Sequence, residues 1–386
     1  MMAIYLIALM CALLHAGYGG SRVVLALYAL NLGADQFTIG TIMALKALCP
    51  TLLALYAGKL VDRVGPRLPM LWGSVGSGFA LALPYFFPGL SVLYVSVVIL
   101  GTSFQFFFVA VQGTTGALGG PEDRARNYSI IAIGFSLAAF LGPLIAGFSI
   151  DYLGYLPAYL VLAATTVIPI VLLWMKPEVL PKAAAGVAGV EPRKSAFDLL
   201  HNAKLRNTFI ASGLISTAWD LYLFYFPIYG NAIGLSASVI GMISAVYAIA
   251  VFVIRVALPG ITRRWGEYAI LVYAIAVAGV AFLLFPWFEN PYLLACVSFL
   301  LGLGLGCGQP LSMSLIYSLA PRGRASESAG MRVTFNNFTH MVVPLTFGGI
   351  GTVLGFAPVF MFGASLLLAG SYYGYRNERA AFQRAP

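Results

Sequence analysis

The sequence predicts an all-α integral membrane protein with twelve transmembrane helices in two six-helix bundles. Three observations carry this prediction: an apolar composition, twelve long apolar runs, and basic residues confined to alternate loops. Of the 386 residues, 60% are hydrophobic and 9% are charged, and the mean hydropathy is +0.90. Soluble domains are about 45–50% apolar and about 25% charged. A soluble core does not need this much apolar surface, so the chain is expected to lie in lipid.

The chain contains twelve runs long enough to cross the hydrocarbon core of a bilayer, which takes about 20 mostly apolar residues. The first run lacks the basic segment of a signal peptide and continues past any cleavage point, so it is predicted to be a membrane helix. Backbone groups in lipid must bond within their own segment, and the runs are too long for barrel strands. The sequence therefore predicts helices over residues 3–31, 37–58, 68–87, 90–117, 127–150, 155–175, 206–230, 236–258, 267–287, 291–319, 327–352 and 356–375.

The distribution of charge predicts the topology. Eighteen of the 22 Lys and Arg residues lie in the even-numbered connections or the C-terminal tail, whereas the odd-numbered connections hold acids such as Asp35, Asp151 and Glu289. Basic residues mark the cytoplasmic side, so both termini are predicted to be cytoplasmic in a multi-pass protein of the cell inner (plasma) membrane. The net charge of +9 follows from this bias and requires no nucleic-acid partner.

The longest even-numbered connection divides the chain in two. It contains KPEVLPKAAAGVAGVEPRK, whose prolines, alanines and scattered charges are typical of a flexible linker. The predicted domains are an N-terminal six-helix bundle over residues 1–175, a cytoplasmic linker over 176–205, and a C-terminal six-helix bundle over 206–386.

A charged, glycine-containing segment follows the second predicted helix. It reads GKLVDRVGPR over residues 58–67 and resembles the loop 2–3 signature of the major facilitator superfamily, roughly G-x-L-a-D-R-x-G-r-k. The twelve spans, their division into six and six, and the cytoplasmic termini agree with this family. The resemblance implies that Gly58 permits close helix packing and that Gly65 makes a tight turn. It also implies a charged latch formed by Asp62, Arg63 and the distal cation Arg67.

The resemblance also implies how the helices are used. Two six-helix bundles face each other, the substrate binds between them near the midplane, and the bundles rock to alternate access. Spans 1, 4, 7 and 10 line the cavity, spans 2, 5, 8 and 11 flank it, and spans 3, 6, 9 and 12 face lipid. Gly142 and Pro143 in the fifth span are similar to a Gly-Pro motif of proton-coupled antiporters in the family.

Five charged residues lie well inside predicted spans, where a lipid-facing charge costs at least ~2.5–3.5 kcal/mol. They are Arg22, Lys46, Asp220, Arg255 and Arg332, and none lies on a span implied to face lipid. If the one acid neutralises one cation, three cations remain and need a counterion. A substrate carboxylate or phosphate suits them, because the planar guanidinium forms two parallel bonds with either group. We therefore expect Arg22 and Arg332 to clamp an anion. Lys46 and Arg255 are expected to contribute to the electric field in the cavity or to gating.

Structural roles for the same residues stay open. Arg255 and Arg332 lie near span ends, where they can snorkel to the interface or hold the bundles together through backbone carbonyls. Lys46 can form a structural pair with the latch. Asp220 can carry the coupling proton, pair with a cation until substrate displaces it, or form a permanent salt bridge.

Neutral polar and aromatic side chains complete the candidate binding site. Two patterns support them: two glutamines lie seven residues apart on one face of the fourth span, and Arg332 starts a polar stripe at i, i+4 and i+8. The alternatives are that this stripe only joins helices and that the aromatic residues only pack. The added residues are Gln105, Gln112, Gln309, Tyr222, Asn336 and His340.

The sequence predicts a secondary active transporter that moves a small organic anion, such as a carboxylate, by alternating access coupled to protons. One alternative is a multidrug/proton antiporter that exports amphipathic compounds, which the Gly-Pro motif and the many aromatic residues favour. Another is a channel or a non-transporting scaffold. No enzymatic pattern is present, because a phosphate-binding glycine loop is missing and the four cysteines lack metal-ligand spacing. We expect no metal, no cofactor and a monomer, with the anionic substrate, protons and the lipid bilayer as partners.

Overall fold

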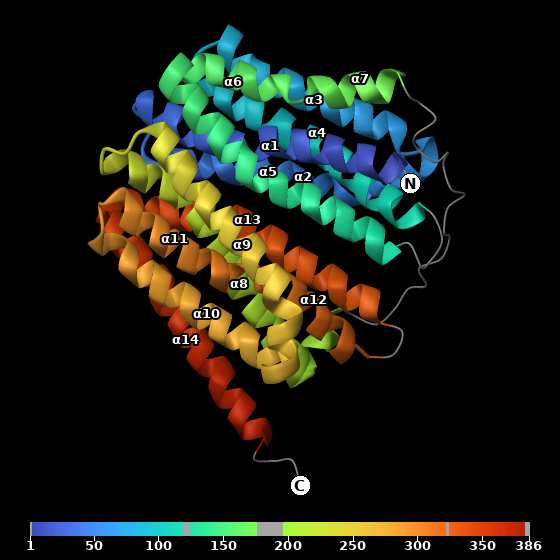
Figure 1. Cartoon of the computed structure of the whole chain (residues 1–386), viewed down its shortest axis with the longest axis vertical. Coiled ribbons are helices and arrows are strands. Elements are labelled where there is room, and N and C mark those ends of the chain that lie inside the picture. The colour runs from blue at the N-terminus through green and yellow to red at the C-terminus, as the bar shows by residue number, and fades with distance from the viewer. Residues whose placement is uncertain (1, 119–123, 176–195, 322–323, 383–386) are drawn as a thin grey trace. The chain divides into compact units, whose positions relative to one another are not determined.

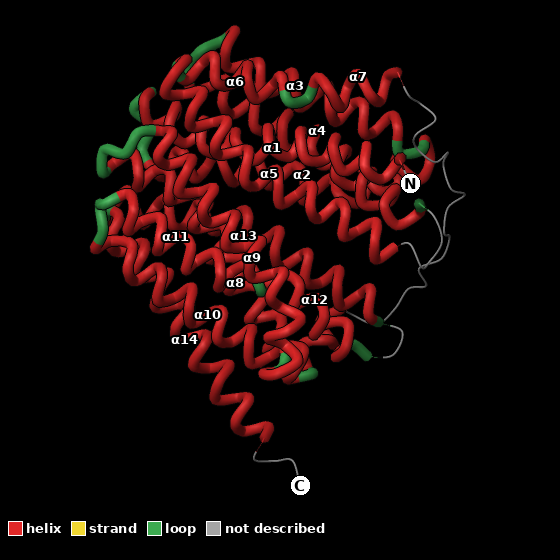
Figure 2. Tube along the Cα trace, in the orientation of Figure 1, coloured by secondary structure: helices red, strands yellow, loops and turns green. Residues whose placement is uncertain are grey.

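The computed structural model describes residues 2–118, 124–175, 196–321 and 324–382. Within these ranges the protein is helical and contains no strand (Figure 1, Figure 2). Each of the twelve predicted spans is helical, which confirms the all-α fold class. The described helices include ten that are long and apolar enough to cross a membrane. The other two spans, α3 (Arg67–Phe86) and α13 (Ala325–Leu354), are 20 and 30 residues long and carry more polar residues and glycines.

Nine of the spans are single α-helices and three are divided. The single helices are α1 (Met2–Asn31), α2 (Gln36–Val64), α3, α4 (Leu90–Ala117), α5 (Arg124–Leu153), α8 (Ala203–Ala232), α9 (Ala237–Trp265), α13 and α14 (Phe356–Phe382). The divided spans are α6 (Tyr155–Ala164) with α7 (Val167–Met175), α10 (Glu267–Leu284) with the 3₁₀ turn η4 (Phe285–Trp287), and α11 (Pro291–Gly306) with α12 (Gly308–Leu319). Of the predicted linker, residues 176–195 lie outside the described ranges, and a short 3₁₀ helix, η3 (Ala196–His201), occupies the part before α8.

Two threonines end α6. Thr165 Oγ1 donates to the carbonyl oxygen of Leu162 over 2.7 Å, and Thr166 Oγ1 donates to that of Ala163 over 2.8 Å. The backbone amides of both threonines bond to the same two carbonyls, three residues back. These short-range bonds tighten the turn to 3₁₀ geometry, so the α-helical ladder stops there and restarts in α7.

The described helices form two compact units. Unit 1 comprises Met1–Gly189 and Gly230–Ala245, and unit 2 comprises Val190–Tyr229 and Val246–Pro386. The helix α9 therefore contributes its first turns to unit 1 and its remainder to unit 2. The division falls near the predicted linker, with the difference that residues 230–245 pack with the N-terminal unit.

Small residues bring α1 and α5 of unit 1 into close contact. A methyl group at Gly20 would lie 2.6 Å from the carbonyl oxygen of Gly142, and one at Gly142 would lie 2.7 Å from that of Ala16. Both distances are too short for a side chain, so glycine permits this crossing. Elsewhere on α1, Tyr18 and Ser21 bond to Lys46 of α2, and the Tyr18 ring stacks on Phe104 of α4.

Unit 2 has an aromatic core in which α8 packs against η4 and α14. The rings of Phe285 and Phe360 are stacked with their centroids 5.2 Å apart. Tyr229 of α8 donates a hydrogen bond from its hydroxyl to the carbonyl oxygen of Phe288 over 3.1 Å. The fully buried rings at this end of α8 and around it are Tyr222, Tyr225, Phe226, Phe282, Phe285 and Phe360.

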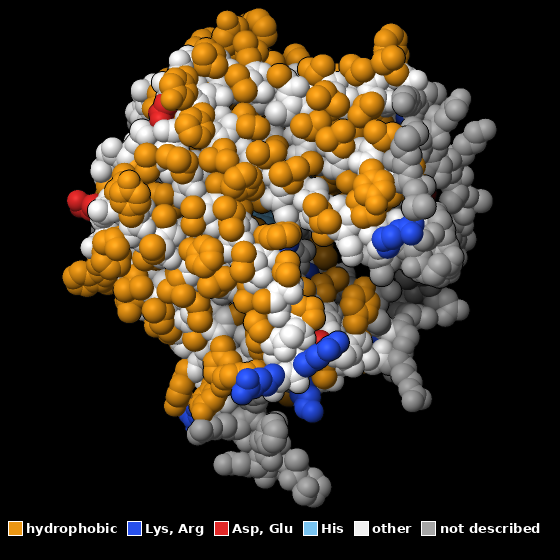
Figure 3. All heavy atoms as spheres, in the orientation of Figure 1, with side chains coloured by type: hydrophobic (Ala, Val, Ile, Leu, Met, Phe, Trp, Pro, Cys, Tyr) orange, Lys and Arg blue, Asp and Glu red, His pale blue; other side chains and the backbone are white. Residues whose placement is uncertain are grey.

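Large apolar side chains also cover the outside of the molecule. Hydrophobic side chains dominate the face seen in Figure 3. The exposed large apolar side chains of the described residues include Tyr152 and Trp174, which are 81% and 73% exposed. Water-soluble monomers rarely expose apolar patches of this extent. The surface is that of a multi-pass membrane protein.

Candidate functional site

The loop 2–3 motif forms a turn between α2 and α3. Gly65 ends α2 with a φ of 80°, a left-handed conformation that favours glycine, which matches the tight turn expected there. The Asp62 and Arg63 side chains are exposed, and the Arg67 guanidinium donates to backbone carbonyls at the end of α7. A methyl group at Gly58 would meet nothing within 4 Å among the described residues. The close packing expected at Gly58 is therefore absent from the described part of unit 1.

Lys46 of α2 is buried in unit 1 and bonded to neutral oxygens of α1. Its Nζ donates to the carbonyl oxygen of Tyr18 over 3.0 Å and to Ser21 Oγ over 2.8 Å. The same ammonium lies 3.9 Å from the centroid of the Tyr18 ring, a cation–π contact. Two hydrogen bonds and one aromatic ring thus occupy the ammonium group, and none of these partners is a carboxylate.

Aromatic rings continue from this ammonium across unit 1. Tyr18 stacks on Phe104 of α4 with centroids 3.9 Å apart, and His15 lies edge-on to both Phe104 and Phe135 at 4.9 Å. The Nδ1 atom of His15 is buried and has no hydrogen-bond partner in the described part of the chain. A cation, an imidazole and a stack of rings therefore share one region of unit 1.

The other predicted site residues of unit 1 lie on α1 and α4. Arg22 follows Ser21 on α1 and is partly buried. Gln105 and Gln112 are partly buried on α4, and the backbone carbonyl of Gln112 accepts a hydrogen bond from the Tyr128 hydroxyl over 3.2 Å. Their binding roles stay predictions.

In unit 2, α8 and α13 lie side by side and run in the same direction. Arg332 Nε donates to Ser212 Oγ over 2.9 Å, and further along the helices His340 Nδ1 bonds to Asp220 Oδ2 over 2.5 Å. The residue numbers differ by 120 in both pairs, so the two helices are in register. The two contacts are eight residues, about 12 Å, apart along the helices. The predicted stripe on α13 therefore faces a matching stripe on α8.

Between the Arg332–Ser212 and Asp220–His340 contacts, one buried polar atom lacks a hydrogen bond among the described residues. Helix register places Ser216 and Asn336 between the two contacts. The Oδ1 atom of Asn336 is buried and has no hydrogen-bond partner among the described residues. A buried acceptor without a partner costs about 1–3 kcal/mol, so this amide favours a ligand that donates a hydrogen bond.

The Asp220–His340 pair has one buried and one accessible partner. The Asp220 side chain is 5% exposed, whereas the His340 side chain is 39% exposed. A proton can therefore reach the carboxylate through the imidazole. Among the described residues Asp220 pairs with this histidine and with none of the four intramembrane cations, a partner that the sequence analysis did not name.

Aromatic side chains stand beside this pair. Trp219 precedes the carboxylate on α8, and its ring is edge-on to that of Tyr247 at 5.5 Å. Tyr222 lies 4.4 Å from Tyr247 and is fully buried, so it packs between rings. The Tyr247 hydroxyl is buried without a hydrogen-bond partner in the described ranges. Tyr222 was predicted as a substrate contact, and Trp219 is a ring next to Asp220 in the chain that the sequence analysis did not name.

Arg332 and Arg255, the two intramembrane cations predicted in unit 2, contact protein oxygens. Arg332 also donates from Nε to Ser312 Oγ of α12 over 3.0 Å. Arg255 of α9 donates from Nε to the carbonyl oxygen of Gly306 over 3.3 Å and from Nη2 to Gln309 Oε1 over 3.5 Å. Arg255 thus links α9 to α11 through a backbone carbonyl and to α12 through the Gln309 side chain, and the first is the kind of structural contact that its position had left open.

The Gly-Pro motif of α5 lies where the first turns of α9 cross it in unit 1. A methyl group at Gly241 would lie 2.4 Å from the carbonyl oxygen of Pro143, and one at Gly147 would lie 2.3 Å from that of Ala237. Beyond this crossing, the two carboxylate oxygens of Asp151 accept hydrogen bonds from the backbone amides of Ala237 and Ser238 over 3.1 and 2.8 Å. A carboxylate at the start of a helix satisfies free amides and complements the helix dipole.

The structure therefore groups the predicted residues into two polar regions. Lys46 lies with Tyr18 in unit 1, and Asp220, Arg332 and His340 lie along α8 and α13 in unit 2. Sequence reasoning missed the serines that bond to the cations, which are Ser21, Ser212 and Ser312. The spacing of Ser212, Ser216 and Asp220 repeats that of the stripe on α13, and this repetition was a signal available in the sequence.

Comparison with known proteins identifies the family. Residues 7–344 match the model of the family described as Major Facilitator Superfamily. The chain is 24% identical to multidrug resistance protein MdtG of Escherichia fergusonii over 96% of this chain and 92% of that protein. It is 23% identical to quinolone resistance protein NorA of Staphylococcus aureus over 90% of each chain. Its fold is similar to that of the nucleoside transporter NupG, with a TM-score of 0.83, 12% identity, and coverage of 97% of this chain and 99% of that one. The chain therefore belongs to the major facilitator superfamily and is a secondary transporter, not an enzyme.

Proposed function

We propose that this transporter exports amphipathic organic compounds in exchange for protons. The observation that carries the proposal is the bond between Asp220 and His340 within the α8–α13 contact. A carboxylate with one bound proton shared with an imidazole is neutralised, whereas the deprotonated pair carries a negative charge that attracts a cationic compound. Two ligands that exclude each other at one group are thermodynamically coupled, and their exchange across a membrane is antiport.

The rings beside the carboxylate support an amphipathic substrate. Trp219, which is partly buried, directly precedes Asp220 and is held edge-on by the buried Tyr247 ring, and aromatic faces attract both flat rings and organic cations. Two relatives that cover at least 90% of the chain are named for resistance to multiple drugs and to quinolones. These names support the drug-export alternative more than the organic-anion hypothesis.

The organic-anion hypothesis assumed buried cations that lack a counterion. Lys46 Nζ is instead bonded to a carbonyl and a hydroxyl oxygen, and Arg332 Nε is bonded to two serine hydroxyls, so neutral protein oxygens meet part of the need for a counterion. The expected clamp takes Arg22 from unit 1 and Arg332 from unit 2 and stays a prediction. In the proposed exporter, Lys46, Arg22 and Arg332 contribute a positive electrostatic potential along the path of the substrate.

We further propose a monomer with two six-helix bundles in the cell inner membrane and both termini in the cytoplasm. The bias of Lys and Arg toward the even-numbered connections supports this orientation. Fusing a reporter that is active only in the cytoplasm to the C-terminus tests the orientation, and an inactive fusion on a folded protein would contradict it.

Export is tested with inside-out vesicles whose interior is acidified, using ethidium as the probe. The wild type should accumulate ethidium and release protons as it does so, and Asp220→Asn should abolish both. Glu289→Gln, which removes an exposed loop carboxylate, is the matched control and should behave as wild type. Ethidium accumulation that persists in Asp220→Asn would overturn the role of the pair. Proton-coupled transport of a carboxylate, with no ethidium transport, would overturn the substrate class.

A further inference from the structure

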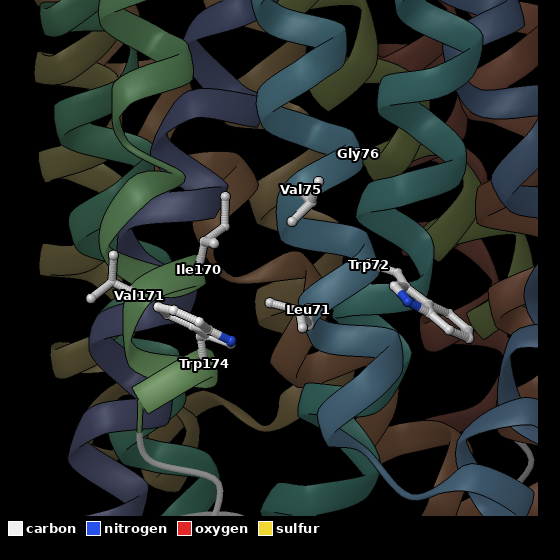
Figure 4. A pocket seen from close by; sticks show the side chains of 7 residues that line it. All are labelled: Leu71, Trp72, Val75, Gly76, Ile170, Val171 and Trp174. Atoms are coloured by element: carbon white, nitrogen blue, oxygen red, sulfur yellow. The ribbon is translucent and has the colours of Figure 1, made fainter.

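Unit 1 carries an open apolar groove between α3 and α7, outside the polar regions described above. Its cavity volume is about 580 Å³, and its lining is almost wholly apolar. Figure 4 shows that Leu71 and Val75 of α3 and Ile170 of α7 flank the space, and that the ring of Trp174 extends from α7 toward Leu71. The complete lining is Leu71, Trp72, Val75, Gly76, Ile170, Val171 and Trp174.

A cation lies at one end of this groove. Arg67 begins α3, and its guanidinium donates from Nε to the carbonyl oxygen of Leu173 over 3.0 Å and from Nη2 to that of Trp174 over 3.3 Å. Because Trp174 itself lines the groove, these bonds place the charge beside the groove end. Arginine has five N–H donors, so donors remain for an anion after these two bonds.

An indole group accompanies the cation. Trp174 is 73% exposed and its ring faces the groove, whereas Trp72, also part of the lining and 54% exposed, turns its ring away from α7 (Figure 4). Tryptophan favours the boundary between hydrocarbon and headgroups, where its ring contacts acyl chains and its N–H meets polar oxygens. The groove therefore passes from a purely apolar interior to an end with N–H donors and a positive charge.

We propose that this groove binds one anionic phospholipid, with an acyl chain between α3 and α7 and the phosphate at Arg67. The apolar lining matches an acyl chain, and the guanidinium matches a phosphate. The distribution of basic residues predicts that this end is cytoplasmic, the side on which basic pockets between membrane helices bind anionic headgroups. The proposal does not depend on what the transporter carries.

The proposal is tested in a full-length protein in which Trp174 is the only tryptophan, with Trp72, Trp219, Trp265 and Trp287 replaced by Phe. The protein is reconstituted in mixtures of phosphatidylglycerol and phosphatidylcholine in which one lipid carries brominated chains, which quench tryptophan on contact. Brominated phosphatidylglycerol should bind about fivefold more strongly, the factor expected for one cation near an anionic group. Arg67→Gln should remove this preference, and Arg67→Lys should retain it.

Two further proteins separate the groove from general lipid contact. A protein that keeps only Trp265, which is 56% exposed and follows Arg264, reports on attraction by basic residues elsewhere. It should show no comparable preference, and an equal preference there would overturn the proposal. Val75→Phe fills the groove from its exposed side without changing the charge, and it should reduce quenching of Trp174 by both lipids. Unchanged quenching in Val75→Phe, or quenching relieved by ethidium instead of by unlabelled phosphatidylglycerol, would also overturn it.

Discussion

His340 of α13 bonds to Asp220 of α8 at a level eight residues beyond the contact between Arg332 and Ser212. The α8–α13 contact therefore has a cation at one level and a carboxylate–imidazole pair at the other. With the pair deprotonated, the two levels carry opposite charge; with a proton bound, only the cation remains. The proton thus changes the field along the seam between the two helices.

Replacing His340 with Asn should uncouple transport from protons, because the exposed partner that passes the proton to Asp220 is lost. Removing a hydrogen bond to a charged group costs about 1.5–3 kcal/mol, which corresponds to a fall in export of about tenfold or more. The measurement is proton-driven ethidium export in vesicles, together with ethidium binding to the purified protein, which should be retained. His201→Asn, in the exposed part of η3, is the control. Export that is unchanged in His340→Asn would show that the imidazole is not needed.

Replacing Lys46 with Met should reduce transport without lowering thermal stability. The buried ammonium is desolvated at a cost that its bonds to neutral oxygens only partly offset, and Met fills similar volume without charge. The unfolding temperature should therefore stay equal or rise while ethidium export falls. A clear fall in unfolding temperature with normal export would instead assign Lys46 a purely structural role.

Replacing Gly241 with Ala should destabilise unit 1. The added methyl group would lie 2.4 Å from the carbonyl oxygen of Pro143, and backbone must move to accept it. Overpacking of this kind costs about 1–3 kcal/mol. Gly213→Ala on α8 is the matched control, because a methyl group there meets nothing within 4 Å among the described residues and alanine favours the helix. Urea titration or thermal unfolding should separate the two variants, and equal stability would contradict the tight crossing.

Asp35 should give the start of α2 a pH-dependent cap. Its carboxylate accepts a hydrogen bond from the Thr38 amide over 2.8 Å. Hydrogen bonding by the Thr38 side chain, and then by its amide, lowers the pKa of Asp35 below its usual value of about 3.9. The stabilisation is therefore complete above the unfolded-state pKa and is lost as the pH falls through the lower folded-state pKa. Unfolding temperatures of wild type and Asp35→Asn should differ by a constant amount above about pH 5 and converge below about pH 4. A difference that is constant down to pH 3 would contradict this assignment.

The sequence was sufficient for the fold because membrane helices are specified by local composition. A run of apolar residues predicts a span wherever it occurs, so the twelve spans were recognisable, and the breaks at Thr165 and Thr166, at Phe285 and at Cys307 were not. Those breaks depend on hydroxyl-to-carbonyl bonds and short-range turns that no hydropathy pattern encodes.

The partners of the buried charges depend on distant contacts. Lys46 bonds to a serine 25 residues away, and Asp220 bonds to a histidine 120 residues away. Charge counting favoured an anionic substrate because it treated each cation as unsatisfied, and it gave no weight to serine hydroxyls and backbone carbonyls. These neutral acceptors are common along every helix, so their pairing with a given cation becomes visible only once the helices are packed.

The cap that Asp151 provides for α9 bears on attempts to produce the halves of this transporter separately. An N-terminal fragment cut within residues 176–195 would lack Ala237 and Ser238, whose backbone amides donate hydrogen bonds to the Asp151 carboxylate. The surface of α5 around Pro143 and Gly147, which packs against the start of α9, would then be uncovered. Co-expression of both fragments should restore a stable protein where separate expression does not. The first turns of α9 thus contribute to the folding of the first half, although they are translated with the second half.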